Sequence, residues 1–97
     1  MIHALLAKPH AIDFRGERLV IRRPRVADLV ACVDQSERGV YMPAWFVMNH
    51  VMDGDSQAFQ TLEQVMQLDG PAVVELAREI EKLYVEGLDL SGPHAKS

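Results

Sequence analysis

Two acidic residues and a histidine near the middle of the chain have the spacing of potential metal ligands. Asp53 and Asp55 would begin a calcium-binding loop, but its sixth position is Ala58 instead of glycine, and its twelfth is Gln64 instead of glutamate. His50 would share a helix face with Asp53 only if a helix continued that far, and two ligands do not make a metal site. We therefore expect a turn with solvated acids, and no metal or other cofactor.

Nucleophilic chemistry has little support in this sequence. The single cysteine, Cys32, has no base beside it in sequence, and it falls next to the apolar face of a predicted helix, where cysteine acts as a small hydrophobe. Acidic pairs such as Glu75 and Glu79 are typical of a solvated helix surface, and no glycine-rich loop could hold a phosphate. We expect no catalytic residue: the protein is not an enzyme and acts by binding.

Arginines gather near the start of the chain, where Arg22, Arg23 and Arg25 surround Pro24. This cluster could contact nucleic acid, but it has few interleaved aromatic residues for stacking, and the net charge of −4 leaves no excess of positive charge. The alternative is a solvated basic edge that discourages strand-to-strand aggregation. Acidic residues dominate later in the chain, and such a polarised surface suits self-association as well as ordinary solubility.

The elements that would position these residues begin with a β-hairpin. Extended apolar patterns predict strands over residues 10–14 and 17–22. Gly16 is expected in the tight turn between them, because glycine takes a positive φ without steric cost. Pro24 ends the second strand, since proline has no amide hydrogen to give to a ladder.

A first helix is predicted from Val26 to between Ser36 and Arg38, with Gly39 as its stop. Arg25 is a poor helix cap, so either Asp28 reaches back from the third helical position to supply the cap, or the start of the helix is frayed. The 3.6-residue period predicts one core face, which consists of Val26, Leu29, Val30 and Val33.

A second helix, predicted over residues 41–52, is apolar around most of its circumference. Such a helix is either central to a core or buried by a neighbouring chain, and both alternatives stay open here. Methionine adds flexible, polarizable side chains that adapt to a partner. The expected partner-binding residues are Tyr41, Met42, Trp45, Phe46, Met48 and Met52.

The rest of the chain predicts a turn over residues 53–56, a short helix over 62–67 and a final amphipathic helix that ends at Gly87. Thr61 and Gln64 match a capping box, and Asp69 is expected to cap the final helix. The core face of the final helix is expected to hold Val73, Leu76, Ala77, Ile80, Leu83 and Tyr84.

We expect one α+β domain over residues 1–97, a mostly helical fold in which an N-terminal β-hairpin packs on about four helices. An undecided arm over residues 1–9 precedes it, and a mobile tail over 89–97 follows.

The order of these elements resembles the small tail assembly chaperones of long-tailed phages, as encoded in prophages. The segment from Leu19 to Leu29 resembles the strand, proline and Asp-Leu pattern at the start of their first helix. The later order is similar too: an apolar helix, the Asp53–Asp55 turn, Phe59, a short capped helix and a final amphipathic helix. The resemblance covers residues 12–88. Its one departure is Arg25, where the family often has threonine or serine.

The resemblance implies that the chain binds the tape-measure protein, and in some cases the tail tube protein, during tail assembly. It implies a site of action in the bacterial host cytoplasm and absence from the mature virion. Some members are extended at the C-terminus by a programmed frameshift. No apolar run approaches the roughly 20 residues of a membrane span, so we expect no membrane partner.

Two other functions remain as alternatives. One is a small DNA-binding regulatory protein that uses the Arg-rich edge, although we expect no nucleic acid partner. The other is a structural tail component that stays in the virion. Self-association is expected in any of these roles, with a stoichiometry that the sequence does not give.

Overall fold

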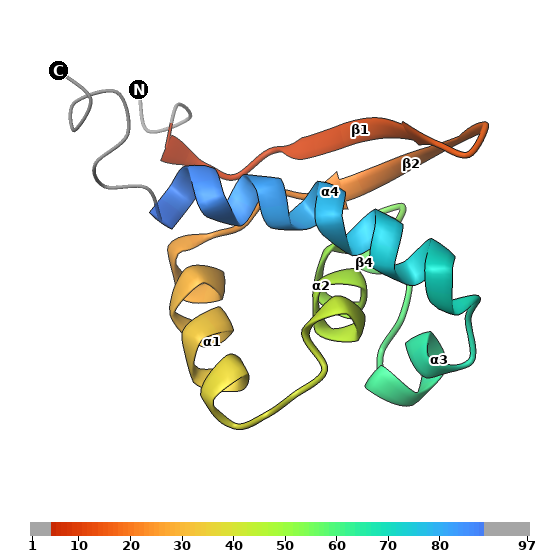
Figure 1. The fold of residues 1–97 in the computed structure, drawn as a ribbon. Helices are drawn as coiled ribbons and strands as arrows, with labels where there is room; N and C mark the ends of the chain where they lie inside the picture. The colour runs from red at the N-terminus through yellow and green to blue at the C-terminus, as the bar shows by residue number, and fades with distance from the viewer. Residues whose placement is uncertain (1–4, 89–97) are drawn as a thin grey trace, which may run out of the picture.

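The computed structural model describes residues 5–88 and shows a four-stranded antiparallel sheet with four helices (Figure 1). The predicted α+β class, with an N-terminal β-hairpin followed by helices, is confirmed. Pro9, the last residue of the undecided arm, belongs to the first strand, and the expected tail over residues 89–97 lies outside the described residues. The elements in chain order are β1 (Pro9–Phe14), β2 (Glu17–Arg22), α1 (Val26–Glu37), α2 (Met42–His50), β3 (Val51–Asp53), β4 (Ser56–Gln57), α3 (Leu62–Met66) and α4 (Gly70–Leu88).

The first hairpin forms as predicted. Ile12 lies opposite Leu19 in the antiparallel register of β1 and β2. The turn residues Arg15 and Gly16 have φ values of 50° and 85°. Positive φ at both central positions is the geometry of the two-residue turns whose twist matches a hairpin.

The second hairpin, β3–β4, corrects the predicted extent of the apolar helix. That helix was expected to reach Met52, but α2 ends at His50 and the chain becomes extended. Val51 and Met52 instead pair with Ile21 and Val20 of β2. Their backbone groups therefore complete the sheet ladder, and this long-range pairing outweighs the local helical pattern.

Helix α1 has the predicted ends, but its predicted core face points the other way. Val26, Val30 and Val33 are 77 %, 67 % and 50 % exposed, whereas Asp28 is buried and Leu29 is half-buried. The expectation that these three valines belong to the core is wrong. The cap from Asp28 is present, because the Arg25 N–H donates to Asp28 Oδ2 at 2.8 Å. This carboxylate lies on the inner face of α1 and turns the valines outward.

The last two helices follow the sequence pattern closely. The Thr61 hydroxyl accepts from the Gln64 N–H at 3.2 Å and the Gln64 side chain reaches back, so the predicted capping box is confirmed. Asp69 Oδ2 accepts from the Ala72 N–H at 3.0 Å and caps α4, which continues one residue past Gly87. The predicted face of α4 lies in the core apart from the half-buried Leu83, and its fully or largely buried members are Val73, Leu76, Ala77, Ile80 and Tyr84.

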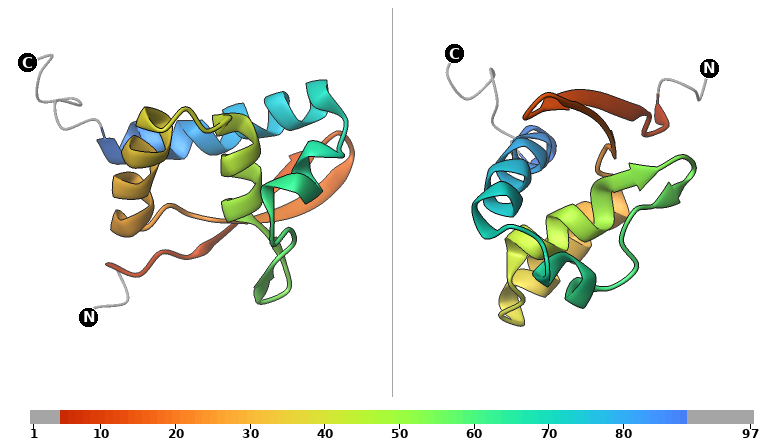
Figure 2. Two further views of the ribbon diagram at one scale, coloured as in Figure 1. Left: turned by 90° about the horizontal axis from the view of Figure 1, so that it is seen from below. Right: turned by 90° about the vertical axis from the view of Figure 1, so that its right-hand side faces the viewer.

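Helix α4 connects two ends of the molecule that carry different helices. Helix α4 runs along its length, α2 crosses α4 near the middle, and α1 and α3 lie near opposite ends of α4 (Figures 1 and 2). Within residues 5–88, no helix has both the length and the apolar composition needed to cross a membrane.

Candidate functional site

Helix α2 lies mainly in the core, so fewer of its residues are exposed than the expected partner-binding set requires. Trp45 and Phe46 are each only 6 % exposed, and their rings meet edge to face with centroids 5.6 Å apart. Both residues were expected to contact a partner; in the folded chain they lie in the core, so little of either side chain is exposed for such a contact. The three methionines of the predicted set, Met42, Met48 and Met52, are half-buried. Tyr41, at the start of α2, is exposed.

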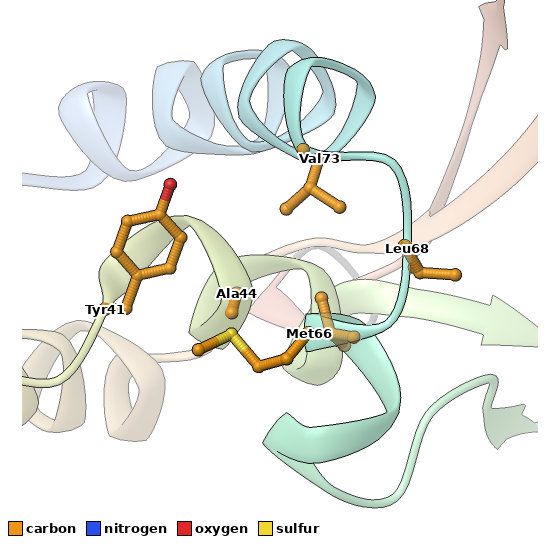
Figure 3. Close-up of a pocket in the computed structure, with 7 residues that line it drawn as sticks. Tyr41, Ala44, Met66, Leu68 and Val73 are labelled. Atoms are coloured by element: carbon orange, nitrogen blue, oxygen red, sulfur yellow. The ribbon is translucent and has the colours of Figure 1, made fainter.

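Tyr41 borders a small apolar pocket between the start of α2, helix α3 and the start of α4 (Figure 3). Val73 lines the pocket from α4, while Met66 and Leu68 line it from α3 and the following loop. Its volume is about 70 Å³, far below the 300–1,000 Å³ of small-molecule sites. The pocket suits a single apolar side chain of a partner.

Residues that begin helices fix the elements that form the walls of this pocket. Pro43 is in the first turn of α2, where its missing N–H costs no hydrogen bond. The capping box at Thr61 begins α3, and the Leu68 N–H donates to the Val65 carbonyl at 3.0 Å in the loop that follows. The Asp69 cap then begins α4 at once. The pocket therefore has a defined shape before any partner arrives.

An apolar groove adjoins the pocket on the side of the first hairpin. Phe14 and Leu19 line it from the hairpin, and Phe59 lines it from the loop before α3. The Gln57 side chain holds this loop, because its Nε2 donates to the carbonyls of Met48 at 2.9 Å and Phe59 at 3.2 Å. Leu68 and Val73 line both the pocket and the groove, so the two hollows form one apolar surface. We call it the Leu68 surface and define it by Tyr41, Met66, Leu68, Phe14, Leu19 and Phe59.

Sequence reasoning did not single out Met66 and Leu68. Both are exposed apolar residues; Met66 ends a helix of only five residues, and Leu68 lies in the loop that follows it. A helix this short has no clear apolar face, so periodicity gives no sign of which residues stay outside the core. Only the structure shows that Val65 is the buried residue of α3, which leaves Met66 on the outer side.

The interior contains a series of hydrogen bonds that passes through the fully buried side chain of His50. His50 Nδ1 lies 2.6 Å from the Arg22 carbonyl oxygen, which can only accept, so Nδ1 carries the ring proton and donates it. The neutral ring keeps a lone pair on Nε2, and the Tyr84 hydroxyl donates to that atom. Both ring nitrogens are therefore satisfied.

The environment of these hydrogen-bonded side chains keeps the His50 and Tyr84 rings uncharged. Burial lowers the pKa of His50 to about 4, although the hydrogen bond to the Arg22 carbonyl acts in the opposite direction. Burial also raises the pKa of Tyr84 well above its usual range, and the Asp28 carboxylate adds to this shift. A buried, neutral pair without access to solvent stabilises the fold and has no route to a substrate.

The arginines of the basic edge are largely engaged by acidic groups. Arg22 and Arg25 both bind Asp28, with Arg25 Nε 3.2 Å from Asp28 Oδ2, and Arg23 Nη2 lies 3.6 Å from Glu86 Oε2. Burial would raise the pKa of Asp28, but hydrogen bonds from Arg25 and Arg22 outweigh it and hold the pKa below its usual range. The hydrogen bond to Asp28 raises the pKa of Arg25 in turn. These contacts make the cluster a structural element that ties α1 to the sheet.

The remaining candidates offer no reactive constellation. Cys32 is half-buried, and burial together with Glu81 raises the pKa of its thiol, the opposite of an activated nucleophile. Asp53 and Asp55 are exposed at the β3–β4 turn, where Gly54 has a φ of 65°. Within the described part of the chain, no three histidine, cysteine or acidic residues are grouped as metal ligands.

Comparisons with protein-family models, curated proteins and solved structures found no match to this chain. The surface of the molecule is therefore what indicates its function. Its apolar hollows are the features suited to recognition.

Proposed function

We propose that this chain is a phage tail assembly chaperone that binds the tape-measure protein, and possibly also the tail tube protein, without catalysis. The observation that carries the proposal is the Leu68 surface: an exposed apolar pocket and groove whose walls are fixed by capped helices. The order of elements along residues 12–88, which resembles that of such chaperones, gives the proposal its partner.

The chemistry of the Leu68 surface suits an amphipathic helix. Such a helix presents apolar side chains at i, i+3, i+4 and i+7 to a hydrophobic groove. One of these would enter the pocket beside Tyr41 and Met66, and its neighbours would lie in the groove along Phe14 and Phe59. The flexible Met66 side chain accommodates different partner residues, as a chaperone requires along a long helical substrate.

The expected role follows from this mode of binding. The chain covers apolar helix faces of the tape-measure protein in the host cytoplasm until tube subunits replace it. Because the surface is small, binding is expected to be weak enough for release during assembly. The protein is then absent from the finished tail.

Coexpression with a tape-measure protein encoded beside this chain tests the proposal. We expect the tape-measure protein to move from the insoluble to the soluble fraction when the chain is present. If it stays equally insoluble with and without the chain, the proposal fails. Mass spectrometry of purified particles separates a chaperone, which is lost, from a structural tail component, which is retained.

DNA binding is checked with a duplex titration at low and moderate salt. The proposal predicts no binding in the micromolar range, because Arg22, Arg23 and Arg25 are already paired with acidic groups. Micromolar or tighter binding with a steep salt dependence would instead favour a regulator.

A further inference from the structure

Acidic side chains border the Leu68 surface both on the side of the first hairpin and on the side of α3. Glu17 lines the groove and lies directly opposite Phe14 in the antiparallel register, so the two side chains share a face of the sheet. Asp69 lines the groove from the loop before α4. Glu63 is exposed one turn before Met66 on the same side of α3, because residues three positions apart share a helix face.

Positive charge near the surface does not balance these carboxylates. Among the described residues, no lysine or arginine lines the pocket or the groove. Arg15 reaches the edge of the groove, but its Nη2 lies 2.7 Å from Glu75 Oε2, whereas its Nη1 is 4.0 Å from Asp69 Oδ2. Within residues 5–88, Glu17 and Glu63 have no ion-pair partner. The rim of the Leu68 surface therefore keeps a net negative charge.

We propose that the segment bound at the Leu68 surface is a basic amphipathic helix, with lysine or arginine on both flanks of its apolar face. This deepens the proposed function and rests on it, because the proposed function supplies the site and the helical form of the partner. The apolar side chains of the helix occupy the pocket and the groove, and its flanking cations face Glu17 and Glu63. The net charge of −4 on the whole chain attracts the same partner at longer range.

The acidic rim gives the surface a means of selecting among helices. Many amphipathic helices share the apolar spacing that fits such a groove, so apolar contacts alone distinguish them poorly. A helix with acidic flanks would bring like charges next to Glu17, Glu63 and Asp69, which is unfavourable. Because these carboxylates are exposed, their effect on binding depends on the salt concentration.

Three synthetic peptides test the charge of the partner. All have leucine at i, i+3, i+4 and i+7, and they differ only in having lysine, glutamine or glutamate on the two flanks of that face. Fluorescence anisotropy measures the affinity of each labelled peptide for the full chain. At about 50 mM salt, the lysine peptide should bind at least about tenfold more tightly than the glutamate peptide, with the glutamine peptide between them. At about 1 M salt, the difference should fall to about twofold or less, because salt screens exposed charges.

Charge-reversed variants show whether the preference comes from this rim. Glu17→Lys and Glu63→Lys should each reduce the preference for the lysine peptide at least about threefold, and together they should abolish it. Glu81→Lys is the matched control for each single variant. It makes the same charge change at an exposed position of α4 whose carboxylate lies near Cys32 of α1, away from the Leu68 surface, and it should leave the preference nearly unchanged. Circular dichroism of each variant shows that a lost preference is not a lost fold.

The results of the peptide titrations separate this proposal from the proposed function. Equal affinities at low salt, no binding of any peptide, or a preference that survives both Glu17→Lys and Glu63→Lys would overturn the basic helix. If the tape-measure protein is nevertheless kept soluble on coexpression, the proposed function stands without it. If the peptides bind in the expected order but the tape-measure protein stays insoluble, the proposed function fails, and the Leu68 surface is a site for a basic helix of another protein.

Discussion

Replacing Tyr84 by phenylalanine removes one oxygen atom from the core and leaves the aromatic packing in place. The ring of Tyr84 lies 4.8 Å from that of Phe46 and 6.1 Å from that of Trp45, centroid to centroid, and phenylalanine keeps both contacts. What is lost is the donor to His50 Nε2, which is fully buried and has no other partner in the described structure. An unsatisfied buried acceptor costs about 1–3 kcal/mol, a large share of the 5–15 kcal/mol that stabilises a typical domain.

Urea unfolding at neutral pH measures this cost. The single tryptophan, Trp45, is in the core, so its fluorescence reports the loss of packing around the same site. We expect Tyr84→Phe to lower the free energy of unfolding by about 1–3 kcal/mol with an unchanged m-value. In a double-mutant cycle with His50→Leu, the phenylalanine substitution should cost much less, because the acceptor is already gone. A Tyr84→Phe protein as stable as the wild type, or additive effects in the cycle, would refute the hydrogen-bonded chain.

Three further predictions concern the same framework. The free energy of unfolding should fall by about 3 kcal/mol as the pH decreases from 6.5 to about 4, because the unfolded chain binds a proton at His50 that the folded chain excludes. Urea titrations at a series of pH values measure this fall, and His50→Leu should remove it. Asp28→Asn should lower stability by about 3 kcal/mol, the lower end for a broken buried ion pair, since Arg25 is largely exposed; thermal unfolding checks this value. Thr61→Ala should cost about 1 kcal/mol by removing the hydroxyl of the capping box, and hydrogen exchange should show it as faster exchange at Gln64.

Local signals made the first hairpin and the helix ends predictable from the sequence. Gly16 and Gly39 both adopt positive φ, and Thr61 and Asp69 cap the helices that they were expected to begin. Each of these features depends on residues within four positions of one another, so a single sequence contains all the information needed.

Features that depend on distant residues were missed or inverted. Val51 and Met52 form a strand only because β2 is beside them, and His50 contacts Tyr84 at a sequence separation of 34 residues. The helical spacing of Val26, Val30 and Val33 in α1 is typical of a face that packs in the core. The inner position nevertheless belongs to Asp28, because it binds two arginines and the Arg25 amide. Hydrophobic periodicity measures amphipathicity and does not show which face of a helix meets the rest of the protein.

The same limit applies to the candidate site. Tyr41 was predicted to face a partner and lies at the rim of the apolar pocket, but Trp45 and Phe46 complete the core instead. Met66 and Leu68 become neighbours of Tyr41 only through the packing of α3 and α4 against α2. A sequence of this length gives the composition of such a surface more readily than its members.

Partner binding at the Leu68 surface is tested most directly by the affinity of the chain for the tape-measure protein, measured for two variants whose replaced side chains are equally exposed. Met66 and Val85 are each 59 % exposed, but only Met66 belongs to the Leu68 surface. In pull-down titrations, Met66→Glu should weaken binding at least about tenfold, because it places a charge in an apolar pocket, while Val85→Glu should bind like the wild type. Equal binding by all three proteins, or an equal loss in both variants, would contradict the assignment of this surface.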